Sequence, residues 1–323
     1  MKIISKIKYP NGKREIYLFG KKVFSYKKKR KATKYDEIYA RRFDGLTQEE
    51  IRYCLEVQFE RMCGYKLNLD NPQTFNEKIQ WLKLYYRNPL MTKCADKVGV
   101  REYIKEKIGE EYLVPIIGVY NSVDEIDFDT LPNKFVMKVN WGSGQNIIVA
   151  DKSKINIKQK KQQLVEWMRQ ENNNYYGSLE WVYKDIKPKI IIEEFLDFDD
   201  DLIDYKIMCY NGQPKNLFTC SERNSSLKVT FFDLNWNKLP FTRLYPTSKI
   251  DIEKPIFYNN MLRIAKILAE PFPFVRVDFY CIKNKLYIGE MTFYPGAGYE
   301  PFNPIEWDYK LGEMLNLPQK EKL

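Results

Sequence analysis

The sequence has 323 residues, of which 44% are hydrophobic and 30% charged, as in a soluble globular protein with room for two or three domains or lobes. It contains no histidine, which excludes His-based triads, His general bases and most zinc sites. Its six cysteines form no Cys-x-x-Cys pair and are expected to be reduced, mostly buried thiols of a cytosolic protein. No apolar run is long enough to span a membrane, and the opening residues lack a signal peptide's apolar stretch.

The net charge of +10 comes from the first 42 residues, which hold 15 basic residues against three acids. Cations alternate there with aromatic and apolar residues, as in KREIYLFGKKVFSYKKKRKATK. This mixture suits peripheral attraction to the anionic inner face of a cytoplasmic membrane. A solvated hairpin followed by a basic linker is the alternative. Nothing resembles a recognition helix or a stacking sheet, so no nucleic-acid partner is expected.

Helices are predicted after this leader. Thr47 with Glu50, and Thr74 with Glu77, form capping boxes that open two of them, and residues 95–109 are expected to form a third. From about residue 116 onward strands dominate, with one helix at Lys158–Arg169 and a late helix at Tyr258–Ala269. The expected strands are Lys134–Val139, Ile147–Val149, Ile190–Glu194, Tyr205–Tyr210, Lys215–Cys220 and Val229–Asp233. Helices that lead into a largely antiparallel region predict an α+β protein.

A glycine loop lies between two strands in FVMKVNWGSGQNIIV, positions 135 to 149. Gly142, Ser143 and Gly144 would let backbone N–H groups approach phosphate oxygens, and Lys138 could reach the same phosphates. The segment is neither a Walker loop nor a dinucleotide fingerprint, because it lacks Gly-Lys-Ser/Thr and no helix follows. An ordinary hairpin turn is the alternative.

Acidic residues follow a buried strand in PKIIIEEFL, positions 188 to 196. A strand end with acidic side chains and free backbone amides can hydrogen-bond an adenine and its ribose. The aspartates that come next lack the glycine of a calcium loop and are expected to form a solvated turn.

A hairpin near the C-terminus sets two acids against each other. Apolar runs at 274–282 and 286–293 flank a polar turn, and one face of the pair is apolar enough to pack in the core. If the turn has three residues, 283–285, Asp278 stands opposite Glu290. A two-residue turn would place the two acids on opposite faces, where they would be solvated or paired with lysine.

The opposed acids predict a bound cation. Two carboxylates about 5 Å apart repel by roughly 3 kcal/mol at an effective dielectric near 20. Mg²⁺ typically takes one or two carboxylates plus phosphate oxygens, so a magnesium ion would remove the repulsion. Arg276, on the same face, could hold an anion beside the metal.

The glycine loop, the acidic strand end and the hairpin with opposed acids follow one another along the chain in this order. In this respect the sequence resembles the ATP-grasp fold and, more narrowly, the TupA-like ATP-grasp family. NPQTFNEKIQWLKLYYRNPLMTKCADKVGVREYI, YLVPIIGVYNSVDEIDFDTLPNKFVMKVNWGSG and FVRVDFY…GEMTFYPG carry the resemblance, which covers about residues 35–315. It implies two α+β lobes that clamp ATP. The implied division is a basic leader with a small hairpin (1–42), a helical region (43–115), a small lobe with the glycine loop (116–187) and a large lobe with the metal site (188–318).

The resemblance also implies roles for particular residues. Asp278 and Glu290 would bind Mg²⁺, with Thr292 at the place of a metal-binding Asn in many ATP-grasp enzymes. Arg276 would steady the transferred phosphate, with Lys138 as the second catalytic cation. Lys97 would contact the α-phosphate of the nucleotide, and Asp204 or Lys206 would contact its ribose or phosphates. The β- and γ-phosphates would lie against Lys138, Gly142, Ser143 and Gly144. The adenine would lie against Glu193, Glu194, Phe195 and Leu196.

The activity implied is ATP-dependent activation of a carboxylate followed by attack of an amine. Members of the family lie among genes for bacterial surface polysaccharides and teichuronopeptide, so the implied substrates are an amino acid or other amine and a uronic acid or similar glycan carboxylate. Arg223 is the candidate for binding the acceptor carboxylate; a surface arginine is the alternative. Two alternatives remain: a glycosyltransferase, a label often given to the family, whose metal would sit at Asp199–Asp201, and a non-catalytic membrane-surface assembly protein. The particular substrates and the oligomeric state are left open.

Overall fold

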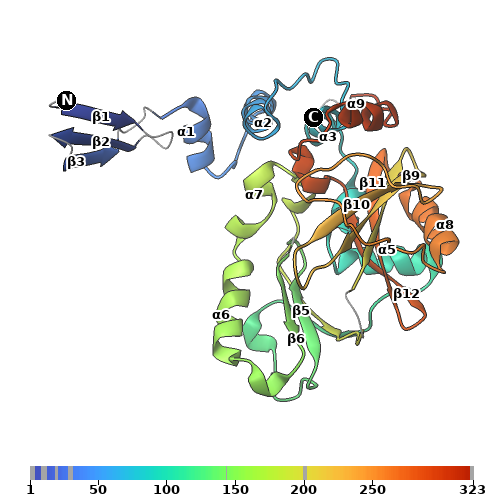
Figure 1. The fold of residues 1–323 in the computed structure, drawn as a ribbon. Coiled ribbons are helices and arrows are strands. Elements are labelled where there is room, and N and C mark those ends of the chain that lie inside the picture. Colours follow the sequence, from blue (N-terminus) through green and yellow to red (C-terminus); the bar gives the residue numbers. More distant parts are fainter. Residues whose placement is uncertain are drawn as a thin grey trace. The chain divides into compact units, whose positions relative to one another are not determined.

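The computed structural model describes residues 4–8, 13–18, 21–27, 32–142, 144–198 and 202–320. The chain divides into two compact units, Met1–Asp44 and Gly45–Leu323 (Figure 1). None of the described helices is both long and apolar enough to cross a membrane. The first unit holds a three-stranded antiparallel sheet and one short helix, so the small hairpin expected in the leader is extended by a third strand. Its elements are β1 (Ile4–Lys8), β2 (Lys13–Leu18), β3 (Lys21–Lys27) and α1 (Lys34–Ala40).

Four helices open the second unit. Both predicted capping boxes are present, because Thr47 and Thr74 each accept a hydrogen bond from the backbone N–H three residues later. Asn88 caps a further short helix with Pro89 at its first position. The four helices are α2 (Gln48–Cys63), α3 (Phe75–Tyr85), α4 (Pro89–Ala95) and α5 (Gly99–Ile108).

A four-stranded antiparallel sheet with the order β4-β7-β5-β6 forms one lobe. Its central strand β7 begins with three isoleucines that are fully buried. Along β5, Phe135, Met137 and Val139 are buried, so Lys138 points to the other face. Helices α6 and α7 connect β6 to β7 and run beside this sheet in Figure 1. The elements are β4 (Ile116–Tyr120), β5 (Phe135–Val139), β6 (Asn146–Val149), α6 (Ile157–Trp167), α7 (Tyr175–Ser178) and β7 (Ile190–Glu194).

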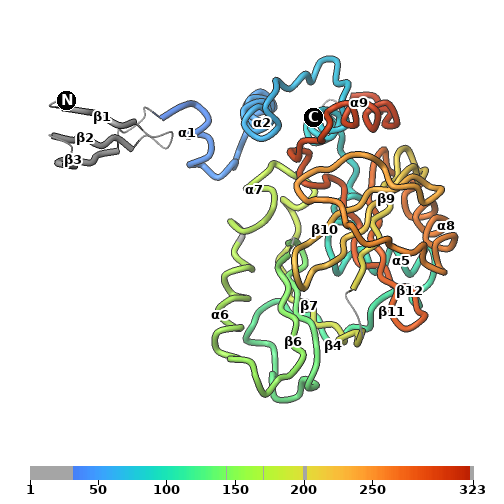
Figure 2. Tube along the Cα trace, viewed as in Figure 1, coloured from blue at the N-terminus to red at the C-terminus, as the bar shows by residue number. Residues whose placement is uncertain are grey.

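A five-stranded antiparallel sheet with the order β10-β9-β8-β11-β12 forms the other lobe (Figure 2). Helix α8 covers one face, which β11 lines with the fully buried Val275, Val277 and Phe279, as expected. The other face is therefore left for the polar residues of the same strands. The elements are β8 (Asp204–Tyr210), β9 (Gln213–Ser221), β10 (Lys228–Asp233), α8 (Tyr258–Ala269), β11 (Phe274–Ile282), β12 (Lys285–Thr292) and α9 (Glu306–Glu313).

The turn between β11 and β12 has two residues, so the three-residue turn expected from the sequence is wrong. Ile282 pairs with Lys285, and the turn residues Lys283 and Asn284 have φ of 47° and 58°. Two successive residues with positive φ are typical of a type I′ turn, whose twist matches the strands of a hairpin.

A β-bulge nevertheless brings the two acids together. Phe279 pairs with Ile288, but the next pair is Asp278 with Glu290, so Gly289 is an extra residue in β12. Without this bulge the two-residue turn would put Glu290 on the core face. The opposition of the two acids is thus confirmed, although a different turn and a bulge produce it.

Candidate active site

Asp278 is the centre of a buried charge cluster on the open face of the five-stranded sheet. Arg276, two residues earlier on β11, donates from Nε and Nη2 to its two oxygens at 2.7 and 2.8 Å. Lys206, the register partner of Asp278 on β8, donates to Oδ2. Burial disfavours the carboxylate, but the two cations more than offset this and hold the pKa of Asp278 below its usual value. Asp278 is therefore ionised throughout the neutral range.

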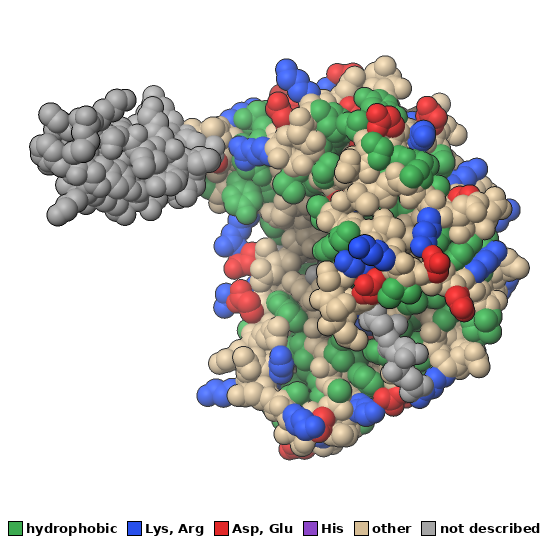
Figure 3. Space-filling view, viewed as in Figure 1, with side chains coloured by type: hydrophobic (Ala, Val, Ile, Leu, Met, Phe, Trp, Pro, Cys, Tyr) green, Lys and Arg blue, Asp and Glu red, His purple; other side chains and the backbone are tan. Residues whose placement is uncertain are grey.

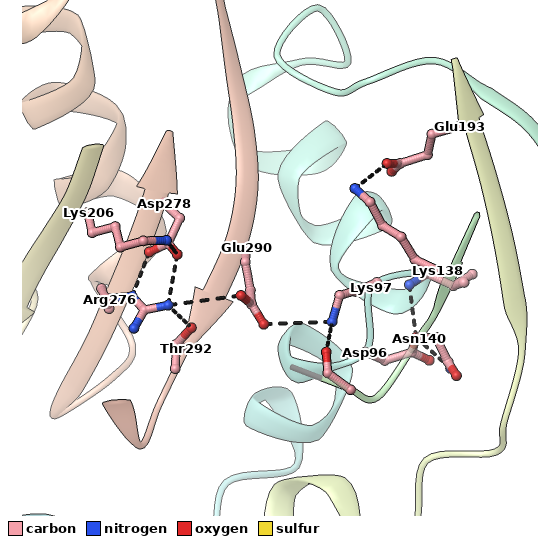
Figure 4. A network of polar contacts seen from close by, with 12 residues as sticks. Asp96, Lys97, Lys138, Asn140, Glu193, Lys206, Arg276, Asp278, Glu290 and Thr292 are labelled. Carbon is pink, nitrogen blue, oxygen red and sulfur yellow. Dashed lines mark hydrogen bonds and ion pairs between the residues drawn. The ribbon is translucent and has the colours of Figure 1, made fainter. Parts of the chain in front are cut away.

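Glu290 lies between this cluster and Lys97, as Figure 4 shows. Its Oε2 is 3.9 Å from Arg276 Nη2, and its Oε1 is 3.7 Å from Lys97 Nζ. The Thr292 hydroxyl accepts a hydrogen bond from Arg276 Nη2 at 2.9 Å. Cations on both sides thus offset the repulsion between Glu290 and Asp278.

Lys97 reaches the site because the connection between α4 and α5 is tied to the end of β5. The N–H of Lys97 donates to the carbonyl of Asn140 at 3.0 Å, and Asn140 Nδ2 donates to Asp96 at 2.9 Å. Lys97 Nζ also donates to the carbonyl of Gly142 at 2.6 Å. Asn140 is fully buried and was not identified from the sequence, where its one signal is its place between a strand and the glycine loop.

The glycine loop joins β5 to β6. Gly144 has φ of 71°, in the left-handed region. A Cβ on Gly142 would lie 1.9 Å from Gln145 Oε1, so a larger residue would require the Gln145 side chain to move. Ser143 lies outside the described residues.

Lys138 points from β5 toward Glu193 at the end of the neighbouring strand β7. Its Nζ is 2.5 Å from Glu193 Oε2, and Arg101 Nη1 lies 3.5 Å from the other oxygen. Burial lowers the pKa of Arg101, and its Nη2 donates to the carbonyl of Val114 at 2.7 Å. Arg101 was missed in the sequence; its only signal was its position one helical turn after Lys97.

A cavity of about 390 Å³ is lined by residues of both lobes. Val136 and Ile148 from the small sheet and Tyr280 and Ile282 from β11 give it apolar walls. In Figure 3 hydrophobic side chains gather over the four-stranded sheet. The structure thereby brings together seven of the residues that the sequence had proposed, namely Lys138, Glu193, Glu194, Phe195, Leu196, Asp204 and Arg223.

Asp204 connects this cavity to the buried cluster. It accepts a hydrogen bond from Arg223, and its Oδ2 is 3.4 Å from Lys206 Nζ. Burial raises the pKa of Asp204. Arg223 and Asp204 both line this cavity. The Asp-x-Asp pattern at 199–201 lies outside the described residues.

The oxygen atoms that could hold a magnesium ion are those of Asp278, Glu290 and Thr292. A carboxylate has about four acceptor sites, and Asp278 uses three of them. Among the described residues, two longer ion pairs alone hold Glu290, so its oxygens can turn toward a cation. In the described ranges no three His, Cys, Asp or Glu side chains are grouped to hold a metal. The donors present fit a Mg²⁺ that completes its shell with phosphate oxygens and water.

Comparisons with known proteins identify the family to which this chain belongs. Two antiparallel sheets that line a shared cavity, with Lys138 in one lobe and Asp278 and Glu290 in the other, are the architecture of an ATP-grasp protein. Residues 77–316 match the model of the TupA-like ATPgrasp family, and the chain belongs to that family. A search of curated proteins found no match.

The solved structures to which the chain is similar are distant from it. D-alanine–D-alanine ligase from Bacillus anthracis, solved with ATP, has 16% identity and a TM-score of 0.34, over 62% of this chain and 53% of the ligase. N5-carboxyaminoimidazole synthetase from Staphylococcus aureus, solved with ADP, has 16% identity and a TM-score of 0.33, over 61% of this chain and 43% of the synthetase. The chain thus spans about half the length of these two proteins.

Proposed function

We propose that the chain is a Mg·ATP-dependent carboxylate–amine ligase. The observation that carries the proposal is the opposition of Asp278 and Glu290 across β11 and β12, with Arg276 and Lys97 as flanking cations. Such a cluster suits phosphoryl transfer, which depends mainly on positioning and on neutralising the charge of the phosphates. The nearby cavity, with its apolar walls and the backbone of residues 193–196, suits an adenine.

The reaction has two steps. A carboxylate oxygen attacks the γ-phosphorus, the bond to ADP breaks, and ADP leaves with the electron pair. An amine then attacks the acyl carbon, a C–N bond forms, and phosphate leaves as the amine loses a proton to water. When bound, Mg²⁺ would neutralise phosphate charge next to Asp278 and Glu290. Lys97 and Lys138 would bind the nucleotide phosphates, and Arg276 would hold the transferred phosphoryl group.

We further propose that the substrates are an amine, such as an amino acid, and a uronic acid or similar carboxylate of a bacterial surface polysaccharide. The family resemblance supports this substrate class. Such substrates would be met in the cytoplasm, with residues 1–42 directed to the inner face of the membrane by their charge.

The direct test is a screen for ADP release in which glycine, alanine, lysine and glutamate are crossed with D-glucuronate, D-galacturonate and their UDP-linked forms. We expect release that requires Mg²⁺, a carboxylate and an amine together. Stoichiometric ADP, phosphate and amide should appear. Binding of UDP-sugars without any binding of ATP would contradict the ligase and favour a glycosyltransferase.

The bulge residue Gly289 gives a second test. A Cβ at this position would lie 2.5 Å from Cε2 of Tyr280, whose ring lines the larger cavity. The added methyl group would displace the Tyr280 ring within the cavity, so Gly289→Ala should weaken ATP binding about tenfold, or about 1.4 kcal/mol, in a calorimetric titration. Gly177→Ala in α7 is the matched control, because nothing lies within 4 Å of its added methyl group. Equal ATP affinity in the two variants would contradict the assignment of this cavity to the nucleotide.

A further inference from the structure

A second, smaller cavity of about 150 Å³ shares residues with the buried charge cluster. Lys206 and Arg276, which both hold Asp278, form part of its wall. Arg243 and Glu300 add further charge, and Phe231 is among its apolar lining residues. Three of these four charged side chains are cationic. The cavity therefore favours an anion, and its volume is less than half that of the larger cavity.

Arg243 is a buried guanidinium with an unused donor. Its side chain is only 6% exposed and stacks over the ring of Phe302 at 4.7 Å. Nη2 donates to the carbonyl of Glu300 at 3.3 Å, and Nη1 lies 3.4 Å from Glu300 Oε2. Its buried Nε–H meets no acceptor within the described part of the chain. The guanidinium is thus a largely desolvated cation in the wall of the cavity, where an anion is attracted more strongly than in water.

The backbone around Arg243 and Glu300 is fixed from two directions. Thr242 and Asn303 exchange a pair of backbone hydrogen bonds of 2.9 Å, which holds the two segments side by side. Asn76 Nδ2 on α3 donates to the carbonyl of Glu300 at 2.9 Å. The guanidinium is thus held in place before any ligand arrives, which reduces the entropy cost of binding.

The preceding turn, residues 295–298, forms another part of the wall and is held by α3. Gln80 Nε2 donates to the carbonyls of Ala297 and Gly298 at 3.0 and 2.8 Å, and Lys83 Nζ donates to Ala297 at 2.7 Å. Both side chains are almost fully buried, and they lie on one face of the helix. Buried polar groups used in this way fix a backbone conformation more tightly than apolar packing.

We propose that this smaller cavity binds the carboxylate substrate and that the Arg243 guanidinium in its wall pairs with the substrate's carboxylate. The substrate class is a small carboxylate-bearing unit, whose reacting group would lie at the Arg276 and Lys206 end of the cavity. This inference rests on the proposed ligase function. It assigns the acceptor carboxylate to Arg243, whereas Arg223 lies at Asp204 in the larger cavity.

The test compares Arg243→Gln with Arg223→Gln in phosphate release, using whichever of D-glucuronate and D-galacturonate is active in the screen above. Arg243→Gln should raise the KM for the uronate at least tenfold and leave the Kd for ATP within twofold of wild type. Arg243→Lys keeps the charge but lacks the planar guanidinium, and it should show an intermediate KM. Arg263→Gln, at an exposed position on α8, is the control for loss of an arginine.

The outcomes separate this inference from the ligase proposal. An unchanged KM in Arg243→Gln, or a rise only in Arg223→Gln, would overturn the inference while the ligase activity stands. A wild-type protein that neither binds ATP nor releases phosphate with any carboxylate would overturn the ligase proposal itself. If Arg243→Gln fails to fold, the KM of Arg243→Lys decides: a value equal to wild type overturns the inference.

Discussion

Asp278→Asn should lower the rate of ADP release about a thousandfold, the largest effect we expect from a single conservative change. The carboxylate is bound by both Arg276 and Lys206, and an amide can neither balance these two cations nor serve as a charged ligand for magnesium. The rate would be measured with saturating ATP, carboxylate and amine. Asp251→Asn is the matched control, because the Asp251 carboxylate is 96% exposed and pairs only with Lys238 among the described residues.

The same variant should also unfold more easily. Removing one partner of a buried ion pair costs about 3–5 kcal/mol, because the remaining charge is left without compensation. The pKa of Asp278 is depressed in the folded protein, so its contribution to stability is full above about pH 4 and is lost as the pH falls further. Urea titrations should therefore show a constant difference between wild type and variant from pH 5 to 8 and a smaller one below pH 4. A full-rate variant with normal stability would contradict both roles.

Lys138→Met should weaken ATP binding at least thirtyfold and lower kcat as well. In the structure Lys138 pairs with Glu193, so the methionine variant leaves this buried acid with Arg101 as its only cation among the described residues. Truncating one partner of a buried charge pair at a binding site costs about 2–5 kcal/mol, which corresponds to thirtyfold or more in affinity. The Kd would be measured by calorimetry with Mg·ATP.

Lys215→Met provides the comparison for Lys138→Met, since Lys215 is an exposed lysine in a strand of the other lobe. It should bind ATP as wild type does. If the two variants lost affinity equally, the loss would reflect overall charge, and the assignment of Lys138 to the phosphates would be wrong.

The last hairpin shows what local sequence determines. The alternation of apolar residues gave the extent of β11 and its core face, because the side chains of a strand alternate whatever it pairs with. The turn was misjudged, because Lys283-Asn284 lacks the glycine that usually marks a type I′ turn. An isolated glycine within a strand often marks a bulge, so Gly289 was the signal that would have completed the prediction.

Other parts of the site depend on contacts between distant segments. Lys206 faces Asp278 only because β8 is the neighbour of β11, and nothing local in either strand fixes that order. Arg101 and Arg243 are single arginines without a motif, and each becomes important only when a partner from elsewhere in the chain is beside it. The family resemblance supplied the lysines and acids, but the smaller cavity became visible only in the folded chain.

Side chains of α3 donate hydrogen bonds to the carbonyls of Ala297, Gly298 and Glu300, which has a consequence for the design of fragments and chimeras of the protein. A fragment that began at β4 would keep every strand of the two lobes, yet it would lose the hydrogen bonds that α3 donates to these carbonyls, although Arg243 would still donate to the carbonyl of Glu300. Chimeras intended to exchange substrate preference between relatives should therefore transfer residues 75–85 together with the turn. Otherwise one parent's helix would meet the other parent's loop.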